Sequence, residues 1–211
     1  VQSAFVDAGQ RCAAGSRIIV FDSVYDLFKK LMLLKTFNLE VGSKDQDNIG
    51  PIINMKNLAK LLHEIEYVRM TKHAEVLIGG HKADYPRVAN GYYMTPTILE
   101  GVSPDNLLSQ DELFGPITCL YRVKDFAEAL KLVSNSKFGL TAAIHTKNMH
   151  RARVFVERVR TGVVSVNGHT YGSEPHMPFG GLGLSGNGWR EPGTEALDVY
   201  SEWKTVYERF D

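Results

Sequence analysis

The sequence predicts an α/β fold, in which a mainly parallel sheet is flanked by helices. Short β-branched and apolar runs alternate along the chain with longer helical patterns. This order is typical of right-handed crossover units, which place strands side by side and cover the faces of the sheet. The 211 residues, with 44% hydrophobic and 23% charged side chains, are enough for a domain with a sizeable core.

The first third of the chain contributes one strand and two helices. Residues 17–21 are a short apolar run that predicts a buried strand, and residues 24–34 follow as an amphipathic helix with Ser23 as its N-cap. Residues 42–51 are a polar loop that ends in a Gly-Pro pair. Apolar side chains at helical spacing then predict a helix over residues 54–71.

The same alternation continues to residue 166. Residues 74–78 predict a strand that a pair of glycines ends, and residues 92–99 predict another strand after a loop rich in Gly, Pro and Asn. The same patterns predict the elements that follow: strand 118–123, helix 125–134, strand 141–145, helix 148–160 and strand 162–166.

The end of the chain breaks this pattern. Residues 197–210 alternate and are rich in aromatic side chains, and no helix follows them. A terminal strand of this kind pairs outside its own sheet, because its free edge offers unpaired backbone groups to another subunit. We therefore expect one compact domain over residues 1–196 and an appended C-terminal oligomerisation strand over residues 197–211.

Composition and charge argue against several classes of partner. The 24 basic residues balance the 24 acidic ones and no stretch concentrates either sign, so we expect no nucleic-acid partner. No apolar run approaches the roughly 20 residues that cross a bilayer, and residues 1–5 do not form a signal peptide, so we expect no membrane partner. Two cysteines are too few for a disulfide framework, which indicates a cytoplasmic setting.

The histidines and serines lack the spacing that metal sites and hydrolases need. His145, His150, His169 and His176 have no H-x-x-x-H or C-x-x-C spacing, so we expect no metal. No G-x-S-x-G elbow occurs, which argues against a Ser-His-Asp hydrolase.

Cys12 is the candidate nucleophile. A lone cysteine is most often a small buried apolar residue, and Cys119, inside the apolar run 117–121, fits that description. The surroundings of Cys12 differ, because Gly9 permits a tight turn and two alanines after the thiol allow close approach. Arg11 and nearby backbone N–H groups would favour the thiolate, and the same N–H groups would stabilise an oxyanion beside the sulfur.

Two further segments stand out, although neither fixes a function by itself. Residues 110–116 place an acidic residue and an aromatic one before Gly-Pro, a pattern that alone indicates an exposed acidic turn. Residues 178–191 contain five glycines, which suggests a phosphate-binding turn. We reject a dinucleotide-binding fingerprint there, because that fingerprint needs a strand before the glycines and a long helix after them, and only a short segment is available before Leu197.

Taken in order, these segments resemble the aldehyde dehydrogenase superfamily over the whole chain. The resemblance implies that family's catalytic-domain fold. Residues 138–142 and 162–167 also look like the family's strands. Three motifs carry the resemblance, and their joint order and spacing are specific: Gly9-Gln10-x-Cys12, Glu112-x-Phe114-Gly115-Pro116, and Pro178-Phe179-Gly180-Gly181 with Ser185-Gly186 and Arg190-Glu191.

The resemblance implies a role for each site residue. Cys12 would attack the aldehyde carbon and NAD or NADP would accept hydride, so that a thioester forms and water cleaves it. Glu112 would hold the nicotinamide ribose, and Phe114 would pack against the nicotinamide. The terminal strand would join a homodimer or homotetramer. The pocket for a small-molecule aldehyde would be lined by Arg11, Asn167, Tyr171, His176 and Phe179.

The sequence also departs from the family pattern. Asp7 stands where many members have Asn, and Trp189 is an extra residue. Residues 1–6 look like the end of an apolar helix, and the family's general-base Glu and cofactor-binding sheet precede the thiol. We therefore expect the chain to begin partway through a larger protein and, by itself, to give no NAD(P)H from aldehyde.

Three alternatives stay open at this point. An acylating relative would pass the thioester to CoA or phosphate, a cysteine hydrolase would use His169 or His176 as a partner, and a non-catalytic member would serve a structural or binding role. Product analysis with each acceptor, substitution of the two histidines and the alkylation rate of Cys12 separate these alternatives.

Overall fold

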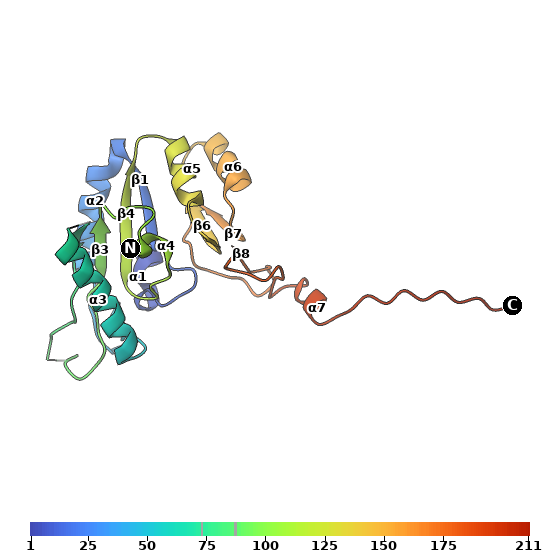
Figure 1. Ribbon diagram of the computed structural model, residues 1–211, viewed down its shortest axis with the longest axis horizontal. Coiled ribbons are helices and arrows are strands. Elements are labelled where there is room, and N and C mark those ends of the chain that lie inside the picture. The colour runs from blue at the N-terminus through green and yellow to red at the C-terminus, as the bar shows by residue number, and fades with distance from the viewer. Residues whose placement is uncertain (73, 87) are drawn as a thin grey trace.

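The computed structural model describes residues 1–72, 74–86 and 88–211. A mixed α/β body carries a C-terminal segment that extends away from it (Figure 1). The elements, in chain order, are α1 (Gln2–Phe5), η1 (Val6–Gly9), β1 (Arg17–Phe21), α2 (Asp22–Phe37), α3 (Met55–Thr71), β2 (Glu75–Ile78), β3 (Thr97–Glu100), α4 (Leu107–Gln110), β4 (Ile117–Val123), α5 (Phe126–Ser134), β5 (Phe138–Gly139), β6 (Thr141–Ile144), α6 (Met149–Arg158), β7 (Val163–Val166), β8 (Leu182–Gly183) and α7 (Ala196–Val199).

The main sheet has four strands in the order β1-β4-β3-β2. β4 pairs in parallel with both β1 and β3, whereas β2 runs antiparallel to β3 at the edge. In the other half of the body, β6 and β7 form a parallel pair, and β5 and β8 form a short antiparallel pair. The predicted α/β fold with mainly parallel pairing is thus present, although the strands are divided among separate sheets.

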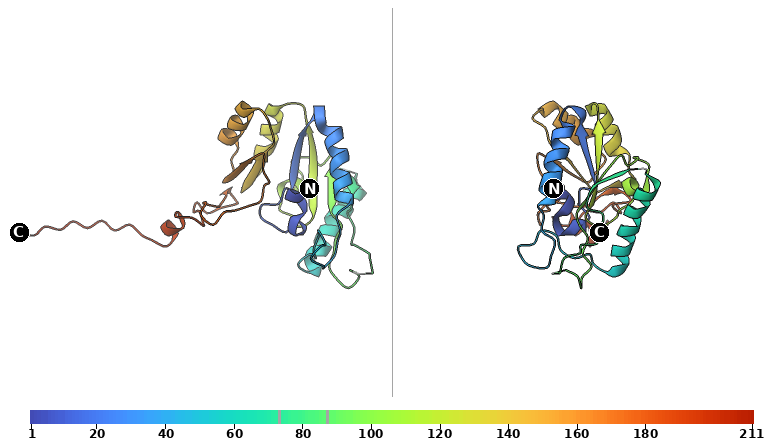
Figure 2. Two further views of the ribbon diagram at one scale, coloured as in Figure 1. Left: turned by 180° about the vertical axis from the view of Figure 1, so that it is seen from behind. Right: turned by 90° about the vertical axis from the view of Figure 1, so that its left-hand side faces the viewer.

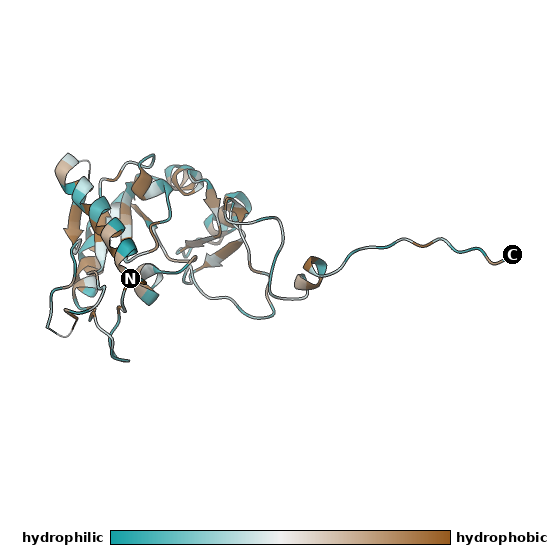
Figure 3. Cartoon of the chain, turned by 60° about the horizontal axis from the view of Figure 1, so that its bottom comes forward, coloured by the Kyte–Doolittle hydropathy of each residue, from teal (hydrophilic) through white to brown (hydrophobic). Residues whose placement is uncertain are grey.

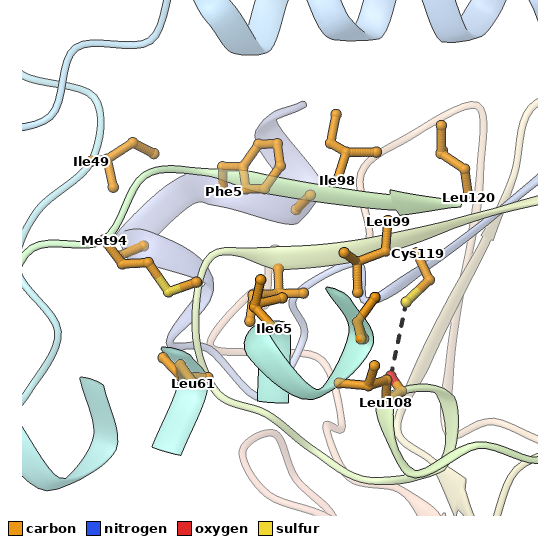
Figure 4. Close-up of a cluster of buried hydrophobic side chains, with 14 of the residues drawn as sticks. Phe5, Ile49, Leu61, Ile65, Met94, Ile98, Leu99, Leu108, Cys119 and Leu120 are labelled. Atoms are coloured by element: carbon orange, nitrogen blue, oxygen red, sulfur yellow. Dashed lines mark hydrogen bonds between the residues drawn. The ribbon is translucent and has the colours of Figure 1, made fainter. Parts of the chain in front are cut away.

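Helices cover both faces of the main sheet and enclose the larger core. In Figure 4, Ile98 and Leu120 point toward α2 on one face, and Leu99 and Cys119 point toward the other face, where α3 lies. All four side chains are at most 1% exposed. This arrangement follows from the alternation of side chains along a strand that is covered on both faces. The hydropathy colouring of Figure 3 shows the same pattern, with apolar strands between helices of mixed polarity.

A smaller core lies between the β6–β7 pair and the helices α5 and α6. It consists of Ala142, Phe155 and Val159, around which partly buried apolar side chains of α5, β6 and β7 pack. Figure 2 shows these elements as a layer next to the main sheet. The chain therefore has two apolar cores, and a single domain over residues 1–196 stays a prediction.

Three predicted helix starts are confirmed by their N-caps. Asn54, Asp125 and Asn148 each accept a hydrogen bond from the backbone N–H three residues later. The prediction for Ser23 is wrong, because α2 begins directly after Phe21, which is its N-cap and makes no side-chain cap. β1 passes into α2 without a loop, so no position for a polar cap exists between them.

The predicted strand over residues 92–99 is also corrected. β3 covers only Thr97–Glu100. Pro96 has no N–H to donate to a ladder, so the residues before it leave the sheet. They form a separate contact, in which Met94 bridges Lys82.

The terminal segment differs from the prediction at its start. Leu197 lies in the short helix α7, so no strand begins there. Residues 200–211 have no regular secondary structure and run away from the body (Figures 1 and 2). Trp203 is 99% exposed, Tyr207 93% and Phe210 90%. A strand needs a partner for its backbone groups, and the described part of this single chain offers the segment none.

Candidate active site

Cys12 lies in the loop between η1 and β1, and its thiol is exposed. We call residues 7–12 the thiol loop. Asp7, Ala8 and Gly9 have positive φ angles of 53°, 56° and 65°. For Asp7 and Ala8 this left-handed conformation is strained, because Cβ crowds the following carbonyl oxygen. The turn expected at Gly9 is present, and it is longer and more strained than its single glycine indicates.

Gly9 packs the thiol loop closely against the bend formed by residues 112–115. A Cβ added to Gly9 would lie 2.2 Å from the carbonyl oxygen of Gly115 and 3.1 Å from that of Ala4. Only glycine fits so close an approach, and the φ of Gly9 favours glycine as well. The contact joins two motifs that are about a hundred residues apart in the sequence.

Gln10 fixes the thiol loop to a second segment. Its Nε2 donates to the carbonyl oxygen of Pro51 at 2.9 Å, and its Oε1 accepts from the N–H of Ile53 at 2.8 Å. These two bonds give a physical reason for a glutamine between the glycine and the cysteine of the first motif. Gln10 is therefore a positioning residue, and sequence reasoning missed this role.

The 112–115 bend is held from the side of α3. Nδ2 of Asn57 donates to the carbonyl oxygen of Phe114 at 3.2 Å, and a Cβ on Gly115 would lie 2.4 Å from Cδ1 of Leu61. Phe114 has a φ of 57°, and its side chain is 41% exposed. Glu112 is exposed too. The bend thus presents a carboxylate and an aromatic ring to solvent from a fixed backbone.

Arg11 connects the thiol loop to the loop after β7. Its guanidinium lies 3.3 Å from the carboxylate of Asp7 and 4.9 Å from the centre of the Tyr171 ring. Tyr171 in turn stacks on His169, with 4.9 Å between the ring centres. Two of the predicted pocket residues, Arg11 and Tyr171, are therefore in direct contact.

The other predicted pocket residues lie elsewhere on the surface. The side-chain amide of Asn167 makes hydrogen bonds of 2.8 and 3.1 Å to the backbone of Thr146. Phe179 exchanges two backbone hydrogen bonds with Glu191, and His176 is exposed. Within the described residues, no hydrogen bond, ion pair or ring contact joins these side chains to the thiol loop, so their place in the pocket stays a prediction.

The second cysteine has the opposite environment. Cys119 is 1% exposed, and its Sγ lies 3.9 Å from the carbonyl oxygen of Leu108 (Figure 4). Burial raises the pKa of the Cys119 thiol to about 12, so this thiol stays protonated at neutral pH. The prediction that Cys119 belongs to the core is confirmed. Cys12 is the thiol that a dissolved electrophile can reach.

Neither of two hollows on the body coincides with the candidate site. Two shallow hollows of the body, one lined by α6 and β7 and one by the ends of α3 and α4, contain none of the predicted site residues. Among the residues that the structure describes, no group of three or more His, Cys, Asp or Glu side chains is arranged to hold a metal ion. No helix within the same ranges is both long and apolar enough to cross a bilayer.

Two solved structures illustrate which known proteins share this fold. An apo structure of betaine aldehyde dehydrogenase from Staphylococcus aureus matches with a TM-score of 0.90 at 26% identity, over 94% of this chain and 40% of that chain. HpcC from Thermus thermophilus matches with a TM-score of 0.90 at 28% identity, over 99% of this chain and 42% of that chain. The fold is thus that of an aldehyde dehydrogenase.

The family is shown by sequence as well. The model described as the aldehyde dehydrogenase family matches residues 1–206, and this chain belongs to that family. The alpha-ketoglutaric semialdehyde dehydrogenase of Bacillus subtilis is 35% identical over 98% of this chain, and the 2,5-dioxopentanoate dehydrogenase of Saccharolobus solfataricus is 38% identical over 99%. The chain covers 43% of the length of each. The resemblance that the three motifs indicate is confirmed.

Proposed function

We propose that this chain supplies the nucleophile for NAD-dependent oxidation of an aldehyde to a carboxylic acid, and that Cys12 is this nucleophile. One observation carries the proposal: the exposed thiol sits on a loop that Gly9 locks against the 112–115 bend. A nucleophile must be both reachable and held in place. A cysteine of the S. aureus betaine aldehyde dehydrogenase is modified by β-mercaptoethanol, which supports a reactive thiol in this fold.

Cys12 would form and release both covalent intermediates of the proposed reaction. The Cys12 thiolate attacks the carbonyl carbon, a C–S bond forms, and the π electrons move to oxygen, which gives a thiohemiacetal. Backbone N–H groups at the turn around Cys12 would stabilise that oxygen. When bound, the nicotinamide dinucleotide supplies the acceptor for the hydride that leaves the former carbonyl carbon. Water then cleaves the thioester, which releases the acid and restores the thiol.

Two exposed side chains of the 112–115 bend fit the cofactor. The carboxylate of Glu112 can accept hydrogen bonds from ribose hydroxyls, and the ring of Phe114 offers an apolar face to the nicotinamide. The S. aureus enzyme is described in complex with NAD+, which supports NAD. NADP is the alternative, since both dinucleotides carry the same nicotinamide ribose.

The relatives support oxidation of a free aldehyde. Some are named for alpha-ketoglutaric semialdehyde, 2,5-dioxopentanoate and benzaldehyde, and none of these names refers to CoA or phosphate. An acylating reaction is therefore not favoured. We propose a small-molecule aldehyde as substrate, and a pocket in which Asn167, His176 and Phe179 complete the surface begun by Arg11 and Tyr171.

Selective alkylation tests the proposal. At mildly alkaline pH, iodoacetamide is expected to modify Cys12 at least about 1,000 times faster than Cys119, because a buried thiol with a pKa of about 12 is hardly ionised. Peptide mapping by mass spectrometry measures both rates, and unfolding in urea is expected to abolish the difference. Equal rates in the folded chain would show that Cys12 has no special access.

We also propose that residues 200–211 pair with a second copy of the protein, as a C-terminal oligomerisation strand of a homodimer or homotetramer. The almost full exposure of Trp203 and Tyr207 supports this, because an apolar strand with unpaired edges is a template for pairing. Deletion of residues 200–211 is expected to yield a monomer with an unchanged circular dichroism spectrum, since the segment contributes to neither core. Light scattering after gel filtration measures the mass, and an unchanged oligomer would refute the pairing.

The state of the two thiols supports a reducing compartment. Both cysteines are free, and Cys12 must stay reduced to act as a nucleophile. We therefore propose that the protein works in the cytoplasm.

A further inference from the structure

We infer that Arg11 binds the carboxylate of aldehydes that carry one, and thereby sets the substrate class of the site. The inference rests on the proposed function, because it places a carboxylate next to the thiol that attacks the carbonyl. Arg11 precedes Cys12 directly, so the two Cα atoms are about 3.8 Å apart. The inference places the carboxylate and the attacked carbon of one substrate at the side chains of these two neighbouring residues.

The guanidinium of Arg11 is positioned before any ligand arrives. It lies 4.9 Å from the centre of the Tyr171 ring. Tyr171 is itself stacked on His169. These restraints reduce the side-chain entropy that Arg11 loses when it binds an anion, an advantage that a mobile surface arginine lacks.

Arg11 keeps hydrogen-bond donors for a ligand. A guanidinium carries five N–H donors, and the contact with Asp7 is between Nη1 and a single carboxylate oxygen, Oδ2. Two parallel N–H donors of an arginine match the two oxygens of a carboxylate. The side chain is 34% exposed, so a dissolved anion can reach it.

Asp7 is a weak competitor for the same guanidinium. Its side chain is 64% exposed, and exposed ion pairs contribute little. The substitution Asp7→Asn removes this competitor without a new backbone cost, since Asn tolerates the left-handed conformation found at this position. Substitution of Arg11 therefore removes the proposed anion site, whereas Asp7→Asn strengthens it.

Two alkylating reagents of different charge test the inference in the chain itself. Iodoacetate has a carboxylate beside the carbon that the sulfur attacks, and iodoacetamide is its neutral counterpart. In both reactions a C–S bond forms and iodide leaves. Arg11→Gln is expected to lower the ratio of the iodoacetate rate to the iodoacetamide rate at Cys12 about tenfold, and Asp7→Asn is expected to raise it. The control Arg209→Gln, in the extended tail, should leave the ratio unchanged.

The ratio separates an anion site from a purely structural role of Arg11. Both reagents attack the same sulfur, so a distorted loop changes both rates together. Arg11→Lys keeps the charge without the two parallel donors and should give an intermediate ratio. An unchanged ratio in Arg11→Gln, with Cys12 still labelled rapidly by iodoacetamide, would overturn the inference alone. If neither reagent labelled Cys12, the proposed function would fall, and the inference with it.

Turnover gives a second measurement in an enzyme of the relatives' full length that contains this chain. Arg11→Gln is expected to lower kcat/KM for 4-oxobutanoate about tenfold to a hundredfold, mainly through KM. For butanal, the uncharged aldehyde of the same length, a change of about twofold at most is expected. Equal losses for the two aldehydes would overturn the inference.

Discussion

Gly9→Val is expected to destabilise the folded chain by at least about 3 kcal/mol and to displace the Cys12 thiol. At a φ of 65°, a side chain with a Cβ crowds its own backbone, at a cost of about 1–2 kcal/mol. The new Cβ would also lie 2.2 Å from the carbonyl oxygen of Gly115 and 3.1 Å from that of Ala4. Both are backbone atoms that cannot rotate away, so the thiol loop must leave the 112–115 bend.

Two other glycines separate the causes of this loss. Gly172 has a φ of 116° and open space around an added Cβ, whereas Gly50 has open space without a positive φ. Gly172→Ala is expected to cost about 1 kcal/mol from the backbone conformation alone, and Gly50→Ala close to nothing. Urea unfolding measures all three variants. A free energy of unfolding for Gly9→Val within about 1 kcal/mol of the parent would show that the thiol loop does not need its close contact with Gly115.

Much of the secondary structure could be predicted because helix and strand periodicities are properties of short segments. α3, α5 and α6 begin directly after Asn54, Asp125 and Asn148, the first residues of the three predicted helical ranges. The errors occur where a neighbouring residue or element determines the position at which a strand or helix begins. Pro96 shortens β3, and the direct passage from Phe21 into α2 leaves Ser23 inside the helix.

The partners of the strands could not be predicted, because pairing joins distant parts of the chain. β1 pairs with β4, which places Arg17 opposite Cys119, and no local pattern records that choice. The division between the main sheet and the β6–β7 pair has the same origin. The terminal segment is the extreme case, since an alternating sequence becomes a strand only where another strand accepts its hydrogen bonds.

In the candidate site too, local motifs could be predicted and contacts between distant segments could not. Cys12, Glu112 and Phe114 could be named because their motifs are local. The bonds of Gln10 to residues 51 and 53 could not be predicted, since those partners lie 41 and 43 residues away. The left-handed backbone of Ala8 could not be predicted either, because alanine does not favour it.

Replacing Cys12 by serine is expected to lower aldehyde oxidation at least about 10⁴-fold in an enzyme of the relatives' full length that contains this chain. A serine hydroxyl is not ionised at neutral pH, and it adds to a carbonyl far less readily than a thiolate does. The fold should be unaffected, because Cys12 is exposed in a loop and serine has nearly the same shape.

Cys119→Ala is the matched control for this substitution. It removes the other thiol, which is buried on the face of the main sheet that α3 covers and points toward Leu108. A small cavity in the core is expected to cost about 1 kcal/mol of stability. The rate per folded molecule should stay the same, because Cys119 is not part of the thiol loop.

Steady-state formation of NADH from a saturating aldehyde is the most direct test of Cys12 as the nucleophile. The expected result is that Cys12→Ser falls to the background rate, while Cys119→Ala turns over like the parent enzyme. A Cys12→Ser enzyme that is folded and keeps more than about a tenth of the parental rate would contradict the assignment, because a tenfold loss corresponds to only about 1.4 kcal/mol of barrier.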